Sequence, residues 1–218
     1  MGVILDSNLS LKEQIKMIKI RAINNLRNIS SISKFLDRDT LLKLVYNLVL
    51  SSIDFCSAIL YDAPNNELRQ LQMIINNAAR LVMKLPRFSR QRITPICIEL
   101  HFLPVKARIF YKIALITYKA LHFDQPRYLR DLLNIYNPDC NVTLRHAIEP
   151  FRLSEPELSR VGFTNRAFSY AAPRIFNQIP PKLRSLSSIN QFKSQLKTWI
   201  FTQCYDLVNM EIKPSFQT

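Results

Sequence analysis

Positively charged side chains are the residues of this chain whose type and spacing suggest a chemistry. The segment 78–112 contains eight of them and a single acid, Glu99. The segment 158–199 contains seven more and no acid. Together the two segments account for the whole formal net charge of +14. Because charge of one sign attracts a polyanion, this concentration predicts sequence-independent contact with the phosphates of RNA or DNA.

The predicted phosphate contacts fall into two sets. The first set, in segment 78–112, comprises Arg80, Lys84, Arg87, Arg90, Arg92, Arg108 and Lys112. The second set comprises Arg166, Arg174, Lys182 and Arg184. Phe88 lies in a polar loop between cations and is the best candidate for stacking on a base, a contact that contributes about 1–3 kcal/mol. The alternative interpretation is an ordinary solvated surface, with Phe110 and Phe168 in the core.

Two helices are expected to position the first set. Residues 66–85 have an apolar stripe at helical spacing, Pro86 ends the pattern, and Arg80 and Lys84 fall on the opposite side. Residues 104–122 are apolar on more than one face, which is typical of a central helix. On that helix Arg108 lies in a basic sector about 40° wide together with Lys112 and Lys119, which predicts a path for a polyanion toward the core.

The remaining elements are also predicted to be helical, so the fold class is all-α. A helix over 11–28 follows a capping box of Ser10 and Glu13, and a helix over 40–52 follows Asp39 and Thr40. Another helix is expected over 189–204. The predicted organisation is a helical bundle over 1–125, an irregular connection with one short helix over 126–160, and a smaller basic helical module over 161–218.

Several classes of site are not expected. The chain has two glycines, so the glycine-rich loops that hold nucleotide phosphates are absent. The four cysteines are separated by more than forty residues, which favours reduced thiols over a metal site or a disulfide framework. The three histidines are scattered without the spacing of a zinc helix. We therefore expect no catalytic residue, metal, cofactor or small-molecule substrate.

Membrane association is not expected either. No apolar run approaches the roughly 18 residues that a transmembrane helix needs. The first residues lack the basic and then apolar pattern of a secretory signal. A nuclear or cytoplasmic location is the resulting expectation.

An ordered series of segments resembles the region downstream of the reverse transcriptase palm in non-LTR retrotransposons of the Jockey, CR1 and L2 type. The segments are GVILDSNLS, IDFCSAILYDAP, LQMIINNAARLVMK, ITPICIELHFLPVKARIFYKIALITYKAL, PRYLRDLL, RAFSYAAPRIFNQIPPKLRS and FKSQLK. Phe102 and Phe176 stand where this family usually has Trp. The palm carboxylates, including the Tyr-x-Asp-Asp turn, have no counterpart in this chain.

The resemblance implies a thumb and trailing region without the catalytic half of an RNA-directed DNA polymerase. In that family the thumb helices hold the template and product backbone, so the implied function is non-catalytic binding of nucleic acid. Two alternatives stay open. The chain is a structural or protein-interaction relic that binds an acidic partner, or it acts in polymerisation jointly with a chain that contains a palm.

Overall fold

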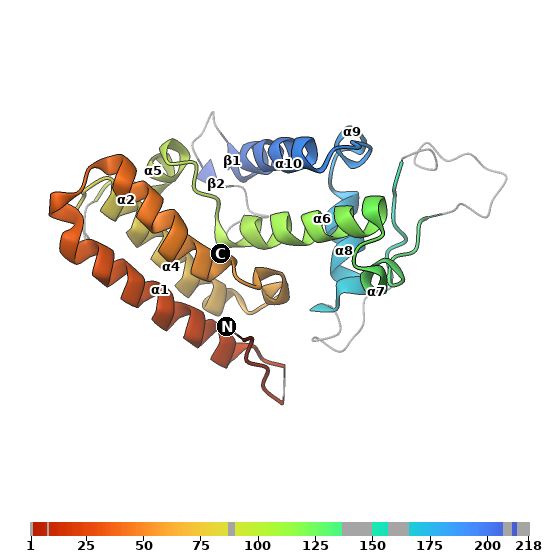
Figure 1. Cartoon of the computed structure of the whole chain (residues 1–218), viewed down its shortest axis with the longest axis horizontal. Coiled ribbons are helices and arrows are strands. Elements are labelled where there is room, and N and C mark those ends of the chain that lie inside the picture. The colour runs from red at the N-terminus through yellow and green to blue at the C-terminus, as the bar shows by residue number, and fades with distance from the viewer. Residues whose placement is uncertain are drawn as a thin grey trace. The chain divides into compact units, whose positions relative to one another are not determined.

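A computed structural model describes residues 2–7, 9–86, 90–136, 150–156, 166–206 and 211–212 (Figure 1). The chain forms two compact units. Unit 1 consists of Met1–Ile109 and Phe201–Thr218, and unit 2 consists of Phe110–Ile200. The described elements are almost entirely helical, which confirms the all-α fold class. The division between the units falls between Ile109 and Phe110, inside a continuous helix.

Unit 1 begins with a long helix, α1 (Lys12–Ile32). Its buried side chains recur at three and four residues and include Ile15, Ile18 and Ala22. This spacing places them on one face of a helix, as the sequence pattern predicts. A short 3₁₀ turn, η1 (Ser33–Phe35), follows α1.

The second helical segment of unit 1 is uninterrupted, but it changes from α-helix to π-helix and back. It runs as α2 (Arg38–Leu44), a π-helical stretch η2 (Val45–Leu50), and α3 (Ser51–Asp54). Asp37 caps it, since the Asp37 carboxylate accepts hydrogen bonds from the backbone N–H groups of Asp39 and Thr40 at 3.1 and 3.2 Å. Hydrogen bonds from Thr40 hold the pKa of Asp37 below its ordinary value.

The next elements of unit 1 are η3 (Ser57–Leu60), α4 (Asn65–Val82) and α5 (Ile93–Glu99). Helix α4 packs against α1, α2 and α5, and α1 and α2 lie alongside α4 in Figure 1. The apolar stripe of α4 is buried as its spacing predicts: Leu68, Leu71, Ile75, Ala78 and Val82. This stripe forms much of the core of unit 1.

Two helices contribute residues to both units. Helix α6 (Val105–Phe123) begins in unit 1 and continues into unit 2, whereas α10 (Ile189–Cys204) begins in unit 2 and ends in unit 1. After α10, the two-residue strands β1 (Tyr205–Asp206) and β2 (Glu211–Ile212) pair in antiparallel fashion. In unit 1 the buried hydroxyl of Tyr205 donates a hydrogen bond of 2.6 Å to the carbonyl oxygen of Phe102.

Unit 2 also contains α7 (Arg127–Arg130), α8 (Phe168–Asn177) and α9 (Pro181–Arg184). Its core is built around Tyr118 on α6, whose ring stacks on that of Phe192 with ring centroids 3.9 Å apart. The Tyr118 hydroxyl donates to the carbonyl oxygen of Leu186. The side-chain amide of Asn177 bonds both the N–H and the C=O of Leu153, at 3.0 and 2.9 Å.

Candidate nucleic-acid interface

The end of α4 turns the chain sharply at Lys84. The N–H of Leu85 bonds the carbonyl of Arg80 at 2.9 Å, and the N–H of Lys84 bonds that of Leu81 at 2.9 Å. These two bonds form a Schellman motif, which places Lys84 in a left-handed conformation with φ 51°. Pro86 follows and prevents the helix from resuming. The turn presents the Lys84 side chain to solvent.

Three cations of the first predicted set are exposed around this turn. Lys84 lies in the turn itself, while Arg90 and Arg92 precede α5. Within the part of the chain that the structure describes, none of the three forms an ion pair with a carboxylate. Their charge is therefore available to a ligand. The predicted contacts Arg87 and Phe88 lie outside the described residues.

Arg80 connects the two ends of the segment that carries these cations. Its backbone carbonyl accepts the hydrogen bond from Leu85, and its Nη2 donates to the carbonyl oxygen of Gln91 at 3.0 Å. The Nη1 atom is buried and has no hydrogen-bond partner among the described residues. Arg80 thus links Leu85, which follows α4, to Gln91, which precedes α5.

The pKa of the Cys97 thiol on α5 is affected by its burial and by two nearby guanidinium groups. The thiol is buried, and desolvation raises its pKa to about 11. The positive charges of Arg108 and Arg80 act in the opposite direction but do not overcome the loss of solvation. The thiol therefore stays protonated near neutral pH, as expected for a packed cysteine.

The structure corrects the prediction for Arg108. This side chain is 10% exposed, and its Nη1 donates to both carboxylate oxygens of Asp54, at 3.0 and 2.8 Å. Its Nε donates to the carbonyl oxygen of Leu103 at 3.0 Å. Since its charge is compensated by Asp54 and its Nη1 and Nε atoms donate inside unit 1, Arg108 is removed from the candidate phosphate contacts. The predicted basic sector on α6 thereby loses one of its members.

Arg184, in the second set, is also corrected. It is 1% exposed, its Nε donates to the carbonyl oxygen of Ile179 at 3.0 Å, and its own carbonyl bonds Nε2 of His122 at 2.8 Å. A polyanion cannot reach a guanidinium buried in this way. The rest of unit 2's predicted contacts keep some exposure: Lys112 and Lys182 are exposed, whereas Arg166 and Arg174 are half-buried.

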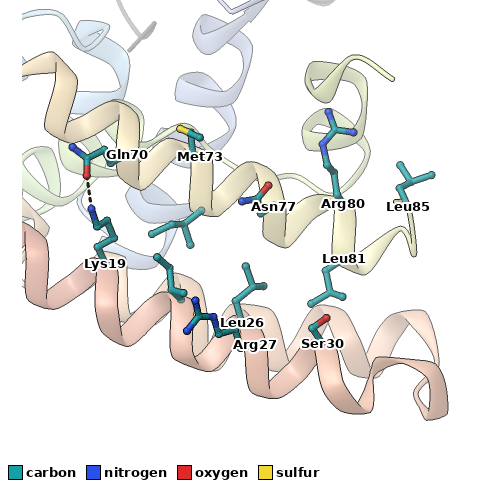
Figure 2. A pocket seen from close by; sticks show the side chains of 12 residues that line it. Lys19, Leu26, Arg27, Ser30, Gln70, Met73, Asn77, Arg80, Leu81 and Leu85 are labelled. Carbon is teal, nitrogen blue, oxygen red and sulfur yellow. Dashed lines mark hydrogen bonds between the residues drawn. The ribbon is translucent and has the colours of Figure 1, made fainter. Parts of the chain in front are cut away.

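Unit 1 also contains a groove between α1 and α4, with a volume of about 520 Å³ (Figure 2). Arg80 lines this groove together with two cations that the sequence did not single out, Lys19 and Arg27 on α1. Lys19 donates a hydrogen bond of 2.6 Å to Oε1 of Gln70 on α4. The spacing of Lys19 and Arg27, eight residues apart on one predicted helix, was the signal available in the sequence.

The histidines and cysteines of the described residues lie mainly in packed surroundings. No group of three His, Cys, Asp or Glu side chains there has the arrangement of a metal site. His122 packs between aromatic rings, 4.1 Å from Tyr118 and 4.3 Å from Phe151 between ring centroids. Among the described cysteines, none of Cys56, Cys97 and Cys204 forms a disulfide. His146 and Cys140 lie outside the described residues.

None of the described helices is long and apolar enough to cross a bilayer. No protein-family model matches the chain, and no curated protein or solved structure matches it either. The resemblance to the downstream region of retrotransposon reverse transcriptases therefore rests on the ordered sequence segments alone.

Proposed function

We propose that this chain binds RNA or DNA through backbone phosphates, as the C-terminal, palm-free part of a non-LTR retrotransposon reverse transcriptase. The observation that carries the proposal is the exposure of Lys84, Arg90 and Arg92 without a described carboxylate partner. A protein binds nucleic acid non-specifically by replacing condensed counterions with such side chains. The sequence resemblance to a thumb region supports the same function.

The local structure favours a phosphate-binding role for these residues over a purely solvated one. Lys84 is held in a rigid helix-terminating turn, and the carbonyl between Arg90 and Arg92 is tied to Arg80 at 3.0 Å. Residues that are fixed in this way lose less conformational entropy when a strand binds. The two ends of the loop thus place three cations on one short stretch of unit 1.

The decisive experiment is the salt dependence of RNA binding. In the full chain, Lys84, Arg90 and Arg92 are replaced together by Ala, and binding of a fluorescein-labelled 20-nucleotide RNA is followed by anisotropy from 50 to 200 mM salt. Each lost phosphate contact reduces the slope of log K against log salt by about 0.7–0.9, so the slope should fall by roughly 2–3. The same titration with a DNA duplex compares the two nucleic acids.

A matched control separates a local site from general attraction. Lys12, Lys43 and Arg69 are exposed cations of unit 1 outside the turn, and replacing all three by Ala removes the same charge. The control should largely retain the slope of the unmodified chain. Equal losses in both triple variants would contradict the assignment of the site. Binding without salt dependence would contradict phosphate contact altogether.

A further inference from the structure

The groove between α1 and α4 has a regular geometry that suits a third helix. The two helices run in the same direction along it, because Lys19 meets Gln70 at one end while Ser30 and Leu81 line the other (Figure 2). From Lys19 to Ser30 the lining residues follow one face of α1. At 1.5 Å per residue, this length is about 16 Å, which corresponds to roughly three turns of a bound helix.

The apolar lining of the groove is aliphatic. It consists of Ile23, Leu26, Met73, Ile74, Leu81 and Leu85. Met73 is 58% exposed, and Leu26, Leu81 and Leu85 are half-buried, so the groove presents apolar surface to solvent. Aliphatic side chains of a helix pack into such a surface, and methionine adapts its shape to the partner. Nucleic-acid bases prefer aromatic rings, and none of the groove-lining residues in the described chain is aromatic.

The charged lining of the groove has one sign. Lys19 and Arg27 contribute to it, and no carboxylate does among the described residues. The guanidinium of Arg80 instead points away from α1 and donates to Gln91 (Figure 2). Arg27 is exposed on α1, and Figure 2 shows its side chain beside Leu26 at the groove. Carboxylates on an apolar partner helix would complement these cations, whereas a basic partner would be repelled.

We infer that this groove binds an acidic amphipathic helix of about three turns from a partner protein. Leucine-like side chains at positions i, i+3, i+4 and i+7 of that helix fill the aliphatic lining. Glu or Asp residues beside them meet Arg27 and Lys19. This interaction differs from the proposed nucleic-acid binding in its charged contacts, which are Lys19 and Arg27 on α1 rather than Lys84, Arg90 and Arg92.

The test uses the full chain and three labelled 14-residue peptides. The first has Leu at the four anchor positions and Glu on their flanks, the second has the same composition in scrambled order, and the third has Lys in place of Glu. Anisotropy titrations should show saturable binding of the first peptide alone. Absence of binding, or equal binding of the scrambled peptide, would overturn the inference.

Groove variants locate the binding, and each has a matched control on the same unit. Arg27→Glu and Met73→Glu should each weaken the first peptide about tenfold or more. Their controls, Arg69→Glu and Met17→Glu, change exposed residues outside the groove and should have little effect. If groove variants and controls behave alike, the peptide binds elsewhere and the inference fails.

A competition experiment separates this inference from the proposed function. The triple Ala variant of Lys84, Arg90 and Arg92 should lose RNA affinity and keep peptide affinity. Single-stranded RNA should not displace the first peptide from the unmodified chain. If RNA displaces it and Arg27→Glu weakens RNA as strongly as peptide, the groove is a nucleic-acid site and the protein-helix inference is overturned.

Discussion

The guanidinium of Arg108 and the carboxylate of Asp54 form an ion pair with two hydrogen bonds, although the two residues are 54 positions apart in the sequence. One nitrogen, Nη1, donates to both carboxylate oxygens. A third bond joins Nε of Arg108 to the backbone of Leu103. The pair therefore connects the end of α3 to the start of α6 within unit 1. Its function is structural, although its sequence context predicts contact with a polyanion.

Arg108→Ala tests this conclusion. The substitution leaves Asp54 unpaired, but this carboxylate is 45% exposed and regains water, so the loss of unfolding free energy should be about 1–3 kcal/mol. Urea unfolding at pH 7 measures it, with the exposed Lys119→Ala on the same helix as control. RNA affinity of the folded protein should not change. A large loss of affinity with normal stability would return Arg108 to the phosphate contacts.

Lys84→Gly separates charge from backbone conformation. Lys84 has φ 51°, a region that costs a side chain about 1–2 kcal/mol and glycine much less. Compared with Lys84→Ala, the glycine variant should unfold with a free energy higher by about 1 kcal/mol. Both variants lack the ammonium group and should lose RNA affinity equally. Thermal unfolding and anisotropy provide the two measurements, and equal stability of the two variants would contradict the Schellman geometry.

The stability of unit 2 should depend on the protonation of His122. Desolvation lowers the pKa of this histidine below its ordinary 6.5, even though the hydrogen bond to Arg184 acts in the opposite direction. Since the unfolded chain then takes up the proton more readily, the stabilising contribution is present above about pH 6.5 and is lost as pH falls below it.

Urea unfolding at pH 7.5 and 5.5 measures this dependence. The unmodified chain should lose more stability between the two pH values than His122→Gln, which keeps a polar group but does not titrate. An identical change in both proteins would mean that other groups account for the pH dependence. A gain of stability at pH 5.5 specific to the unmodified chain would reverse the sign and contradict the assignment.

Tyr205→Phe probes the hydrogen bond that joins the two stretches of chain in unit 1. The hydroxyl that it removes donates to Phe102, and burial raises the Tyr205 pKa so that the donor remains protonated at neutral pH. Loss of this bond leaves a buried carbonyl unsatisfied and should cost about 1–3 kcal/mol. Tyr128→Phe, at a 70% exposed site, is the control and should be close to neutral. Equal stabilities would show that the hydrogen bond contributes little.

Helical periodicity in the sequence predicted much of the fold. The expected helix over 66–85 corresponds to α4, that over 104–122 to α6, and that over 189–204 to α10. These predictions succeeded because each helix buries a repeating apolar face. Helix α8 was not predicted, since Pro173 lies inside it and proline normally ends a helix.

The helix starts were predicted less accurately, because several polar residues compete for the same backbone donors. Asp6 accepts the N–H groups of Ser10 and Leu11, at 2.7 and 3.0 Å, ahead of α1. Glu13, expected to complete a capping box, instead pairs with Lys16 at 3.4 Å. Such choices depend on the path of the chain before the helix, which local spacing does not specify.

The candidate site was predictable where it depends on local sequence and not where it depends on tertiary contacts. Lys84, Arg90 and Arg92 are exposed near a helix end that Pro86 marks in the sequence. Asp54 lies too far from Arg108 in sequence for their pairing to be inferred, and the burial of Arg184 likewise follows from packing in unit 2. The groove could not be predicted, because its lining depends on how α1 and α4 are aligned against each other, and the sequence of either helix alone does not specify that alignment.

The hydrogen bond between Tyr205 and Phe102 has a consequence for synthesis on the ribosome. Unit 2 is an uninterrupted stretch of chain, so all of its residues emerge from the exit tunnel in one continuous passage. In unit 1, by contrast, Tyr205 is translated about a hundred residues after Phe102, to which it donates its hydrogen bond. The hydrogen bond from Tyr205 to Phe102 therefore forms only after every residue of unit 2 has been translated.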